Sequence, residues 1–282
     1  MSAVYELTHS KTNIFLIEGT DGCLLFDTGW AGSMDAFESS LHAVKKSIGD
    51  ISYVLMSHYH PDHCGLAQEL ADNGAVILAL DLQVPFLHCA DEVYEKGTKP
   101  EYKKFRPIDN SKVKVLTVAE SRDFLDTLGI SGEILHTPGH SDDSVSLLLD
   151  EGVAFVGDLN PLYELELHKG TQIADSWDKI LSHKLKVVYY GHAKKHVFEK
   201  TGFFRLPDLF RSKDKTPKKP ESETFALVSS IMRMIDKETP IDIICKKTGA
   251  DRVLVEDINR MYLTHPGVGV QGILDRIEIK GR

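Results

Sequence analysis

The sequence predicts an α/β protein, because segments typical of strands and of helices alternate along most of its 282 residues. Short apolar runs rich in β-branched and aromatic residues, such as 51–57 and 144–149, have the length and composition of buried strands. Amphipathic segments with start signals, such as Ser33 at the beginning of 33–47, have the pattern of helices. Polar residues directly follow several of the apolar runs, which is typical of strands that end at a ligand site.

The first 110 residues are expected to begin with three consecutive strands and then to alternate between helix and strand. Gly19-Thr-Asp-Gly22 has the composition of a hairpin turn between the second and third strands. Residues 81–110 are mixed in character and contain three prolines, so we expect a helix plus an irregular excursion long enough to roof a pocket. The remaining expected elements, in order, are strands at 3–8, 12–18 and 22–27, a helix at 33–47, a strand at 51–57, a helix at 65–72 and a strand at 75–79.

The second half is expected to continue this alternation and then to change character. The composition shifts at 211–220, a basic segment with two prolines that cannot join a core and therefore predicts a linker. We expect one domain at 1–210 and a second, winged-helix-like domain at 221–282. The expected elements are strands at 113–118, 133–136, 144–149, 153–157 and 186–190, a helix around 175–182, C-terminal helices at 222–236, 240–249 and 251–263, and one or two strands within 268–280.

Composition excludes several classes of protein. A net charge of −9 argues against a general nucleic-acid binder or a protein of anionic membranes. The first residues lack the basic flank and apolar core of a signal peptide, and no apolar run approaches the ~20 residues that span a bilayer. The cysteines form no Cys-x-x-Cys pair, which favours reduced thiols over a disulfide framework. We therefore expect a cytoplasmic protein with four scattered thiols, at Cys23, Cys64, Cys89 and Cys245.

The segment 58–63 concentrates four potential metal ligands within six residues. It follows an expected strand, and in extended backbone His58 and His60 point to the same side, so both can hold one ion. Pro61 fixes its own φ, after which the chain turns. Asp62 and His63 are therefore aimed elsewhere and could serve a second ion. A surface loop that merely contains histidines is the alternative interpretation.

Three later residues stand in the same kind of position. His140, Asp158 and His192 each come just after an apolar strand run. Several strands of one sheet can present such side chains at a common edge. Together with the cluster at 58–63 they supply seven nitrogen and oxygen ligands, which is about what two ions in one site require.

These motifs resemble those of the metallo-β-lactamase superfamily. The similarity covers roughly residues 1–200, in the family's order and approximate spacing. It is carried by Asp27-Thr-Gly29, Ser57-His-Tyr-His-Pro-Asp-His-Cys-Gly65, His136-Thr-Pro-Gly-His-Ser141, Gly157-Asp158 and Gly191-His192. The resemblance implies an αββα sandwich with two divalent metal ions at one sheet edge, zinc by default, with iron or manganese also accepted.

The resemblance also implies a role for each residue. Asp158 would bridge both ions, and Asp27 would support the metal loops without binding metal. A histidine at position 60, where diiron flavoprotein relatives have glutamate, speaks against oxygen reduction. The first ion would be held by His58, His60 and His140, and the second by Asp62, His63 and His192.

The implied reaction is hydrolysis by a hydroxide that bridges the two ions, with Asp62 able to shuttle the proton. The expected substrate is a small ester, thioester or lactone. Three alternatives stay open: a phosphodiesterase, a mononuclear iron dioxygenase that acts on persulfides, and a ligand- or metal-sensing DNA-binding regulator. No substrate-binding residue is assigned, but five aromatic residues could line a pocket or simply pack: Phe86, Tyr94, Tyr102, Phe105 and Tyr163.

The C-terminal segment bears on the choice of partner. From residue 221 onward it carries nine basic and ten acidic residues, which is no electrostatic footprint for binding phosphates. We therefore expect a small-molecule substrate, no nucleic acid and no membrane. The segment would cover the catalytic domain, contribute to a substrate lid or make a homodimer contact.

Overall fold

The computed structural model describes residues 2–9, 12–198, 223–235, 237, 239–264, 270, 273 and 274. The chain divides into two compact units, one formed by Met1–Leu162 with Lys169–Leu206 and the other by Tyr163–His168 with Pro207–Arg282. The expected linker at 211–220 lies outside the described residues, so the boundaries at 210 and 221 stay a prediction. Each unit is described below by itself.

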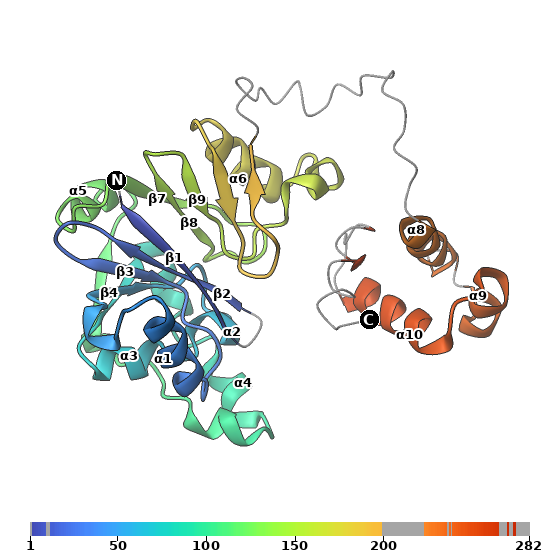
Figure 1. Cartoon of the computed structure of the whole chain (residues 1–282), viewed down its shortest axis with the longest axis horizontal. Helices are drawn as coiled ribbons and strands as arrows, with labels where there is room; N and C mark the ends of the chain where they lie inside the picture. The colour runs from blue at the N-terminus through green and yellow to red at the C-terminus, as the bar shows by residue number, and fades with distance from the viewer. Residues whose placement is uncertain are drawn as a thin grey trace. The chain divides into compact units, whose positions relative to one another are not determined.

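The first unit contains a six-stranded mixed sheet (Figure 1). Its first three strands are antiparallel and follow one another along the chain, and the last three join in parallel. Gly19 donates its N–H to the Gly22 carbonyl at 2.9 Å, which confirms the expected turn. The strand order is β1 (Ala3–His9), β2 (Thr12–Glu18), β3 (Cys23–Phe26), β4 (Tyr53–Leu55), β5 (Val76–Leu80) and β6 (Val113–Leu116).

A second, five-stranded sheet completes this unit. It is antiparallel except between β9 and β10, which run in parallel. The two-residue strand β11 was not expected from the sequence, since so short a segment carries no pattern. The strand order is β11 (His196–Val197), β10 (Val187–Tyr189), β9 (Val153–Phe155), β8 (Val145–Leu149) and β7 (Gly132–His136).

Alternation along β2 shows how the layers are built. Phe15 and Ile17 belong to a core cluster that includes residues of the second sheet, such as Phe155. Ile14 and Leu16, on the opposite face, belong to a cluster that includes residues of helix α1 (Met34–Ala43) and of α3 (Ala67–Asp72). Since successive side chains of a strand point to opposite faces, the sheet is covered by the other sheet on one side and by helices on the other.

Several helices differ from the expected ones. The expected helix at 65–72 is two short helices, α2 (Pro61–Cys64) and α3. Because Pro61 is preset for the first helical position, helical structure begins four residues early and includes Asp62 and His63. Ser33 stands at the start of α1, but its hydroxyl donates to the Trp30 carbonyl at 2.6 Å and does not cap the helix.

The segment 81–110, expected to be one helix plus an irregular excursion, contains four short helices joined by irregular stretches. They are η2 (Asp81–Phe86), α4 (Asp91–Lys96), η3 (Pro100–Lys104) and η4 (Asn110–Lys112). Helix α5 (Ser121–Asp126) was not expected from the sequence, because six residues are too few for a clear helical period. The remaining helices before the C-terminal segment are η1 (Ile48–Asp50), η5 (Leu162–His168) and α6 (Gln172–Leu181). Most of η5 belongs to the second unit.

The second unit contains the three expected C-terminal helices, α8 (Glu223–Ile235), α9 (Ile241–Thr248) and α10 (Arg252–Thr264), around a small apolar core. Gly249 ends α9 with a left-handed φ of 71°, and Asp251 accepts the Leu254 N–H at 2.9 Å. Of the strands expected within 268–280, the structure describes only Val270, Ile273 and Leu274, and these are helical. The rest of that segment lies outside the described residues, so a winged helix stays a prediction.

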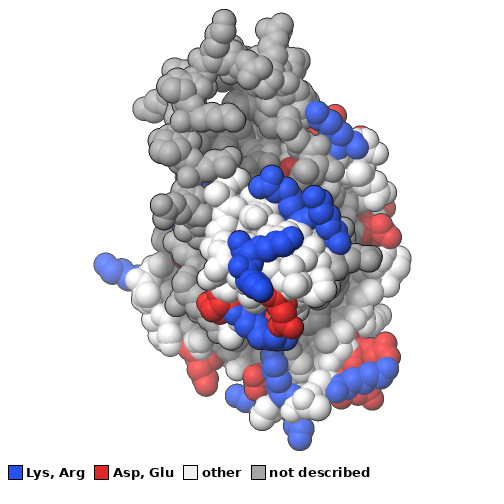
Figure 2. All heavy atoms as spheres, turned by 90° about the vertical axis from the view of Figure 1, so that its right-hand side faces the viewer, with Lys and Arg blue, Asp and Glu red and all other residues white. Residues whose placement is uncertain are grey.

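Acidic and basic side chains lie next to one another on the face shown in Figure 2. In the second unit, for example, Arg252 forms ion pairs with Asp242 and Glu256. Among the residues that the structure describes, no helix combines the length and apolar character that crossing a bilayer requires.

Candidate metal centre

The seven predicted ligands come from four connections that follow strands. His58 and His60 follow β4, and helix α2 then carries Asp62 and His63. The other three lie three or four residues beyond the ends of β7, β9 and β10, at His140, Asp158 and His192. The two sheets therefore deliver all the candidate ligands to one region, as expected from their positions after strand runs.

The ligand atoms form three groups in which all atoms lie within 4.8 Å of one another. His58, His60 and His140 make one group. Asp62, His63 and His192 make a second, and the third, which contains Asp158, takes His58 from the first and His63 from the second. The first two groups contain the same residues as the two metal positions implied by the sequence resemblance.

Asp158 lies between the first two groups. Its Oδ1 is 3.3 Å from His63 Nε2, and its Oδ2 is 3.6 Å from His192 Nε2 and 3.7 Å from His140 Nε2. Within the second group, Asp62 Oδ2 is 2.8 Å from His192 Nε2. A single carboxylate thus lies near candidate ligand nitrogens of both groups, as the bridging role implied by the resemblance would require.

Three buried ligand atoms make no well-aligned hydrogen bond within the described residues, although the last two form an ion pair at 3.3 Å: His58 Nε2, His63 Nε2 and Asp158 Oδ1. A buried polar atom without a partner costs about 1–3 kcal/mol, so such atoms need a reason to be there. All three belong to one group of candidate ligands, and imidazole nitrogen with carboxylate oxygen is a donor set that Zn²⁺, iron and manganese accept. The residues present therefore fit divalent metal ions.

Asp27 contacts residues of the candidate site through both of its carboxylate oxygens. It is buried, with φ of 65°, a conformation that aspartate and asparagine tolerate better than most residues. Its Oδ1 accepts the Ser57 N–H at 2.7 Å, and its Oδ2 lies 2.9 Å from His63 Nδ1. This contact holds the proton on Nδ1 and leaves Nε2 free for a metal, so Asp27 supports a ligand without being one.

Ser57 is a contact residue that the sequence did not single out. Its hydroxyl lies 3.0 Å from Asp27 Oδ2, 2.9 Å from His58 Nδ1 and 3.3 Å from His63 Nδ1. One hydroxyl therefore touches a histidine of each group. Its position immediately before the ligand cluster is the only signal in the sequence that pointed to it.

Two glycines allow this close packing. Gly157 has φ of 54°, and a Cβ there would lie 2.5 Å from the Cβ and Oγ of Ser57. A Cβ on Gly191 would lie 2.5 Å from Asp158 Oδ1 and 2.9 Å from His63 Cε1. These positions, each next to a ligand in the sequence, are where the backbone approaches the site most closely.

The charges of the site favour a cation. Burial lowers the pKa of His58 well below its usual range, and the neighbouring His63 lowers it further. Burial also opposes a charge on His63, but the carboxylates of Asp158 and Asp27 outweigh it and raise the pKa of His63 well above its usual range. Burial opposes ionisation of Asp158, yet His63 and His192 hold its pKa well below the usual value. Asp158 is therefore ionised, and a bound cation would take the place of the His63 proton.

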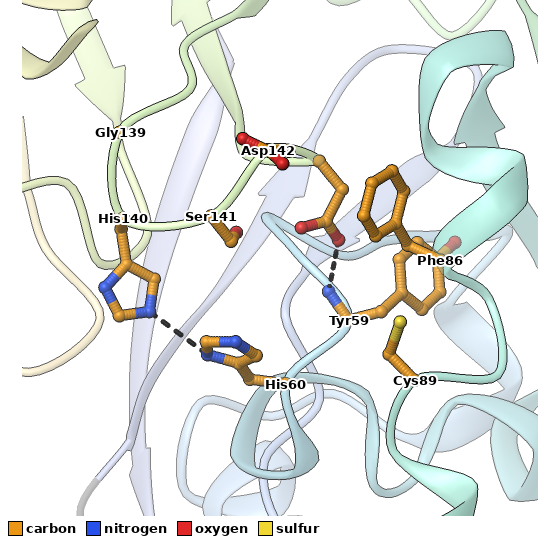
Figure 3. Close-up of a pocket in the computed structure, with 9 residues that line it drawn as sticks. Tyr59, His60, Phe86, Cys89, Gly139, His140, Ser141 and Asp142 are labelled. Atoms are coloured by element: carbon orange, nitrogen blue, oxygen red, sulfur yellow. Dashed lines mark hydrogen bonds between the residues drawn. The ribbon is translucent and has the colours of Figure 1, made fainter.

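A pocket of about 420 Å³ opens beside His60 and His140 (Figure 3). Of the five aromatic residues considered from the sequence, Phe86 lines this pocket. The side chain of Tyr163 lies outside the described residues. The complete lining is Tyr59, His60, Phe86, Cys89, Gly139, His140, Ser141, Asp142 and Asp143.

The other three aromatic residues of the 81–110 segment pack against one another. Tyr94 stacks on Phe105 with ring centres 4.1 Å apart and meets Tyr102 edge-on at 5.1 Å. The Tyr94 hydroxyl donates to the Pro61 carbonyl, so this cluster supports the helix that carries Asp62. The packing interpretation is therefore correct for these three. Cys64, which follows the ligand cluster, is buried in the apolar core.

Comparison with known proteins gives a match to a family model. The model of the metallo-beta-lactamase superfamily matches residues 7–192, which span every candidate ligand. The chain is also similar to a beta-lactamase-like protein 2 homolog from Drosophila melanogaster, at 25% identity over 66% of this chain and 60% of the fly protein. A protein from Claviceps purpurea named atrochrysone carboxyl ACP thioesterase is 26% identical over 54% of this chain and 41% of its own length. The matched regions thus span about half of these curated relatives.

A solved structure shares the fold. A metallo-beta-lactamase family protein from Thermus thermophilus superposes with a TM-score of 0.53 at 17% sequence identity. The superposition covers 100% of this chain and 93% of that one. At this level of identity the likeness concerns the fold alone.

Proposed function

The chain belongs to the metallo-β-lactamase superfamily, and we propose that it is a dinuclear metal-dependent hydrolase of a small ester, thioester or lactone. One observation carries the proposal: two three-residue ligand groups share the neighbouring carboxylate of Asp158. A mononuclear site would need only one of these groups. The buried ligand atoms without hydrogen-bond partners support metal binding, although they belong to one group and do not by themselves call for a second ion.

In this proposal one ion would be held by His58, His60 and His140, and the other by Asp62, His63 and His192. Asp158 would contact both ions. Two divalent ions, when bound, supply Lewis acidity and a hydroxide nucleophile near neutral pH. Zinc is the default for these ligands, with iron or manganese as alternatives. The protein fixes the ligand geometry through Asp27 and Ser57.

Burial opposes a charge on Asp62, but the contact with His192 holds the pKa of Asp62 below its usual value, so it is a carboxylate that can accept a proton. Its carboxylate is mostly buried, with 20% of the side chain exposed, and it lies 2.8 Å from His192 Nε2. With metal bound, His192 would be a ligand and could not share that proton, so Asp62 would receive it from the nucleophile and return it to the leaving group. We assign this shuttle to Asp62 in addition to its place among the ligands.

Acyl substrates are favoured by two considerations. One relative of the chain is named as an acyl carrier protein thioesterase. The pocket beside His60 and His140 is also of a size that suits a small molecule. Phosphodiesters use the same kind of metal site, so phosphodiester cleavage is the alternative hydrolytic activity to test.

The decisive experiment is metal quantification on the purified full-length protein, followed by assays of ester, thioester, lactone and phosphodiester substrates. We expect two divalent ions per chain and acyl hydrolysis that stops on chelation and returns with metal. One iron per chain with persulfide oxidation would overturn the proposal in favour of a dioxygenase. Tight, salt-dependent DNA binding without turnover would overturn it in favour of a regulator.

A further inference from the structure

The pocket beside the metal centre has two chemically different sides. His60 and His140 stand at one side, and Phe86 and Cys89 lie across from His140 (Figure 3). Tyr59 also lines the pocket, but its side chain is buried. A group bound here would have candidate metal ligands at one end and aromatic surface at the other.

The remaining wall carries negative charge. The segment 139–143 contributes Asp142 and Asp143, and no lysine or arginine is among the residues that line the pocket. Asp143 is held in place, because its Oδ2 accepts the Tyr59 N–H at 2.7 Å. Gln83 fixes the backbone of the same wall by donating to the Asp143 carbonyl at 3.1 Å. The acidic wall is therefore a built feature of the pocket.

An acidic wall of this kind favours uncharged ligands over anionic ones. A carboxylate or phosphate placed in this pocket would meet Asp142 and Asp143 and find no cationic side chain to balance it. An apolar chain would instead contact the half-buried ring of Phe86. The thiol of Cys89 adds no charge at neutral pH, because burial and the carboxylates of Asp143 and Asp91 raise its pKa.

We infer that this pocket binds the acyl part of the substrate and selects acyl groups that are uncharged and partly apolar. The inference rests on the proposed hydrolase function, which it makes more specific. It predicts that substrates with a carboxylate or phosphate at the far end of the acyl chain are rejected. Asp142, which is exposed and lies on the wall, is the specificity-determining residue.

The first test compares two esters of equal acyl length. Metal-loaded full-length protein is assayed with 4-nitrophenyl hexanoate and with the mono-4-nitrophenyl ester of adipic acid. We expect kcat/KM to be at least about tenfold higher for the uncharged ester. Asp142→Lys should narrow this ratio by about threefold or more by favouring the anionic ester. The matched control is Asp126→Lys, a charge reversal at an exposed residue of α5 that does not line the pocket.

The second test measures charge preference without turnover. Iodoacetamide and iodoacetate differ in charge, and each forms an S–C bond with the Cys89 thiolate as iodide leaves. Peptide mass spectrometry gives both labelling rates, and N-acetylcysteinamide gives the ratio for a free thiol. We expect the amide-to-acid ratio at Cys89 to exceed the free-thiol ratio severalfold and to fall in Asp142→Lys.

The outcomes separate the two proposals. If the metal-loaded protein hydrolyses no ester, thioester or lactone, the hydrolase proposal fails, whatever the labelling shows. If esters are hydrolysed, equal kcat/KM values for the neutral and anionic esters would overturn the inferred specificity. A labelling ratio at Cys89 equal to that of the free thiol, or equal effects of Asp142→Lys and Asp126→Lys, would overturn it as well.

Discussion

The two ligand groups differ in how the protein holds them. We call His58, His60 and His140 the open group, because His60 and His140 are exposed and line the pocket. The rings of these two exposed histidines contact each other, with His140 Nε2 3.1 Å from His60 Nδ1. Nothing in this pair fixes the rings as firmly as a buried carboxylate would.

We call Asp62, His63 and His192 the anchored group. His63 is fully buried between the carboxylates of Asp27 and Asp158. Its carbonyl accepts from the N–H and the hydroxyl of Thr28, at 2.8 and 2.9 Å. Partners of this kind set ligand orientation and commonly contribute about 10–100-fold to metal affinity.

If each group holds an ion, as proposed, the two metal positions would not be equivalent. In the anchored group His63 is fixed by buried contacts, while His60 and His140 of the open group face the pocket. We therefore expect the anchored group to bind its ion more tightly and the open group to exchange its ion more readily. The predictions below test this expectation, beginning with the change that should affect both groups most.

Asp158→Ala removes the carboxylate shared by both groups. We expect both ions to be lost and kcat/KM to fall by about 10³-fold, since several kcal/mol of charge stabilisation disappear. Elemental analysis and ester assays measure the two effects, and circular dichroism checks that the chain remains folded. Asp126→Ala, on the exposed surface of α5, is the control. Retained metal and activity in Asp158→Ala would refute the bridging assignment.

Asp27→Asn tests the anchoring contact alone. Asparagine keeps the shape and tolerates the left-handed backbone of this position, but it removes the charge and turns one of the two acceptors, for Ser57 N–H or His63 Nδ1, into a donor. We expect the anchored group to lose metal affinity by about 10–100-fold, and the open group to lose less, because Asp27 reaches His58 only through Ser57. Competition with a chromophoric chelator resolves the two binding steps. An equal loss at both steps would contradict the comparison.

Gly191→Ala tests the close approach of the backbone to the anchored group. The added Cβ would lie 2.5 Å from Asp158 Oδ1, so either the ligands or the backbone must shift. We expect weaker metal binding and a loss of about 1–3 kcal/mol in the free energy of unfolding, measured by urea denaturation. Gly49→Ala is the matched control, because its Cβ would meet no atom closer than 3.8 Å. If the two variants had similar metal affinity and similar free energy of unfolding, the backbone at Gly191 would have adjusted to the added Cβ without loss of stability.

Asp72→Asn should have the smallest effect and should spare both groups. Hydrogen bonds from Lys112, Arg106 and Gln68 lower the pKa of Asp72 from 3.8 to about 2. A lowered pKa in the folded chain stabilises it above pH 3.8, and this contribution disappears as the pH falls through about 2. Because Arg106 and Lys112 are exposed, the contribution is about 1 kcal/mol at neutral pH.

Urea denaturation at several pH values checks this last prediction. The stability of wild type and Asp72→Asn should differ above about pH 4 and converge toward about pH 2. Metal affinity should be equal in the two proteins, because Asp72 is outside both ligand groups. A change in metal affinity would show that the groups depend on distant surface charges.

Much of the architecture could be predicted from the sequence, because strand patterns are local. The expected strands from 3–8 to 186–190 correspond to ten of the strands in the structure, since apolar runs bounded by turns determine them directly. Short elements such as α5 and β11 were missed, because a pattern needs more residues than they contain. The start of helix at Pro61 was also missed, since the interpretation placed a turn there.

The sequence by itself determined which residue types reach the metal centre and in what order. The ligands follow strand ends, and their placement there is encoded by local apolar patterns and by Pro61. Only the tertiary structure decided how they are held and what lies beside them. The contacts of Asp27 with Ser57 and His63, the approach of Gly191 to Asp158 and the acidic wall near Phe86 all join segments that are far apart in the chain. Such contacts depend on how the two sheets pack, which no local pattern specifies.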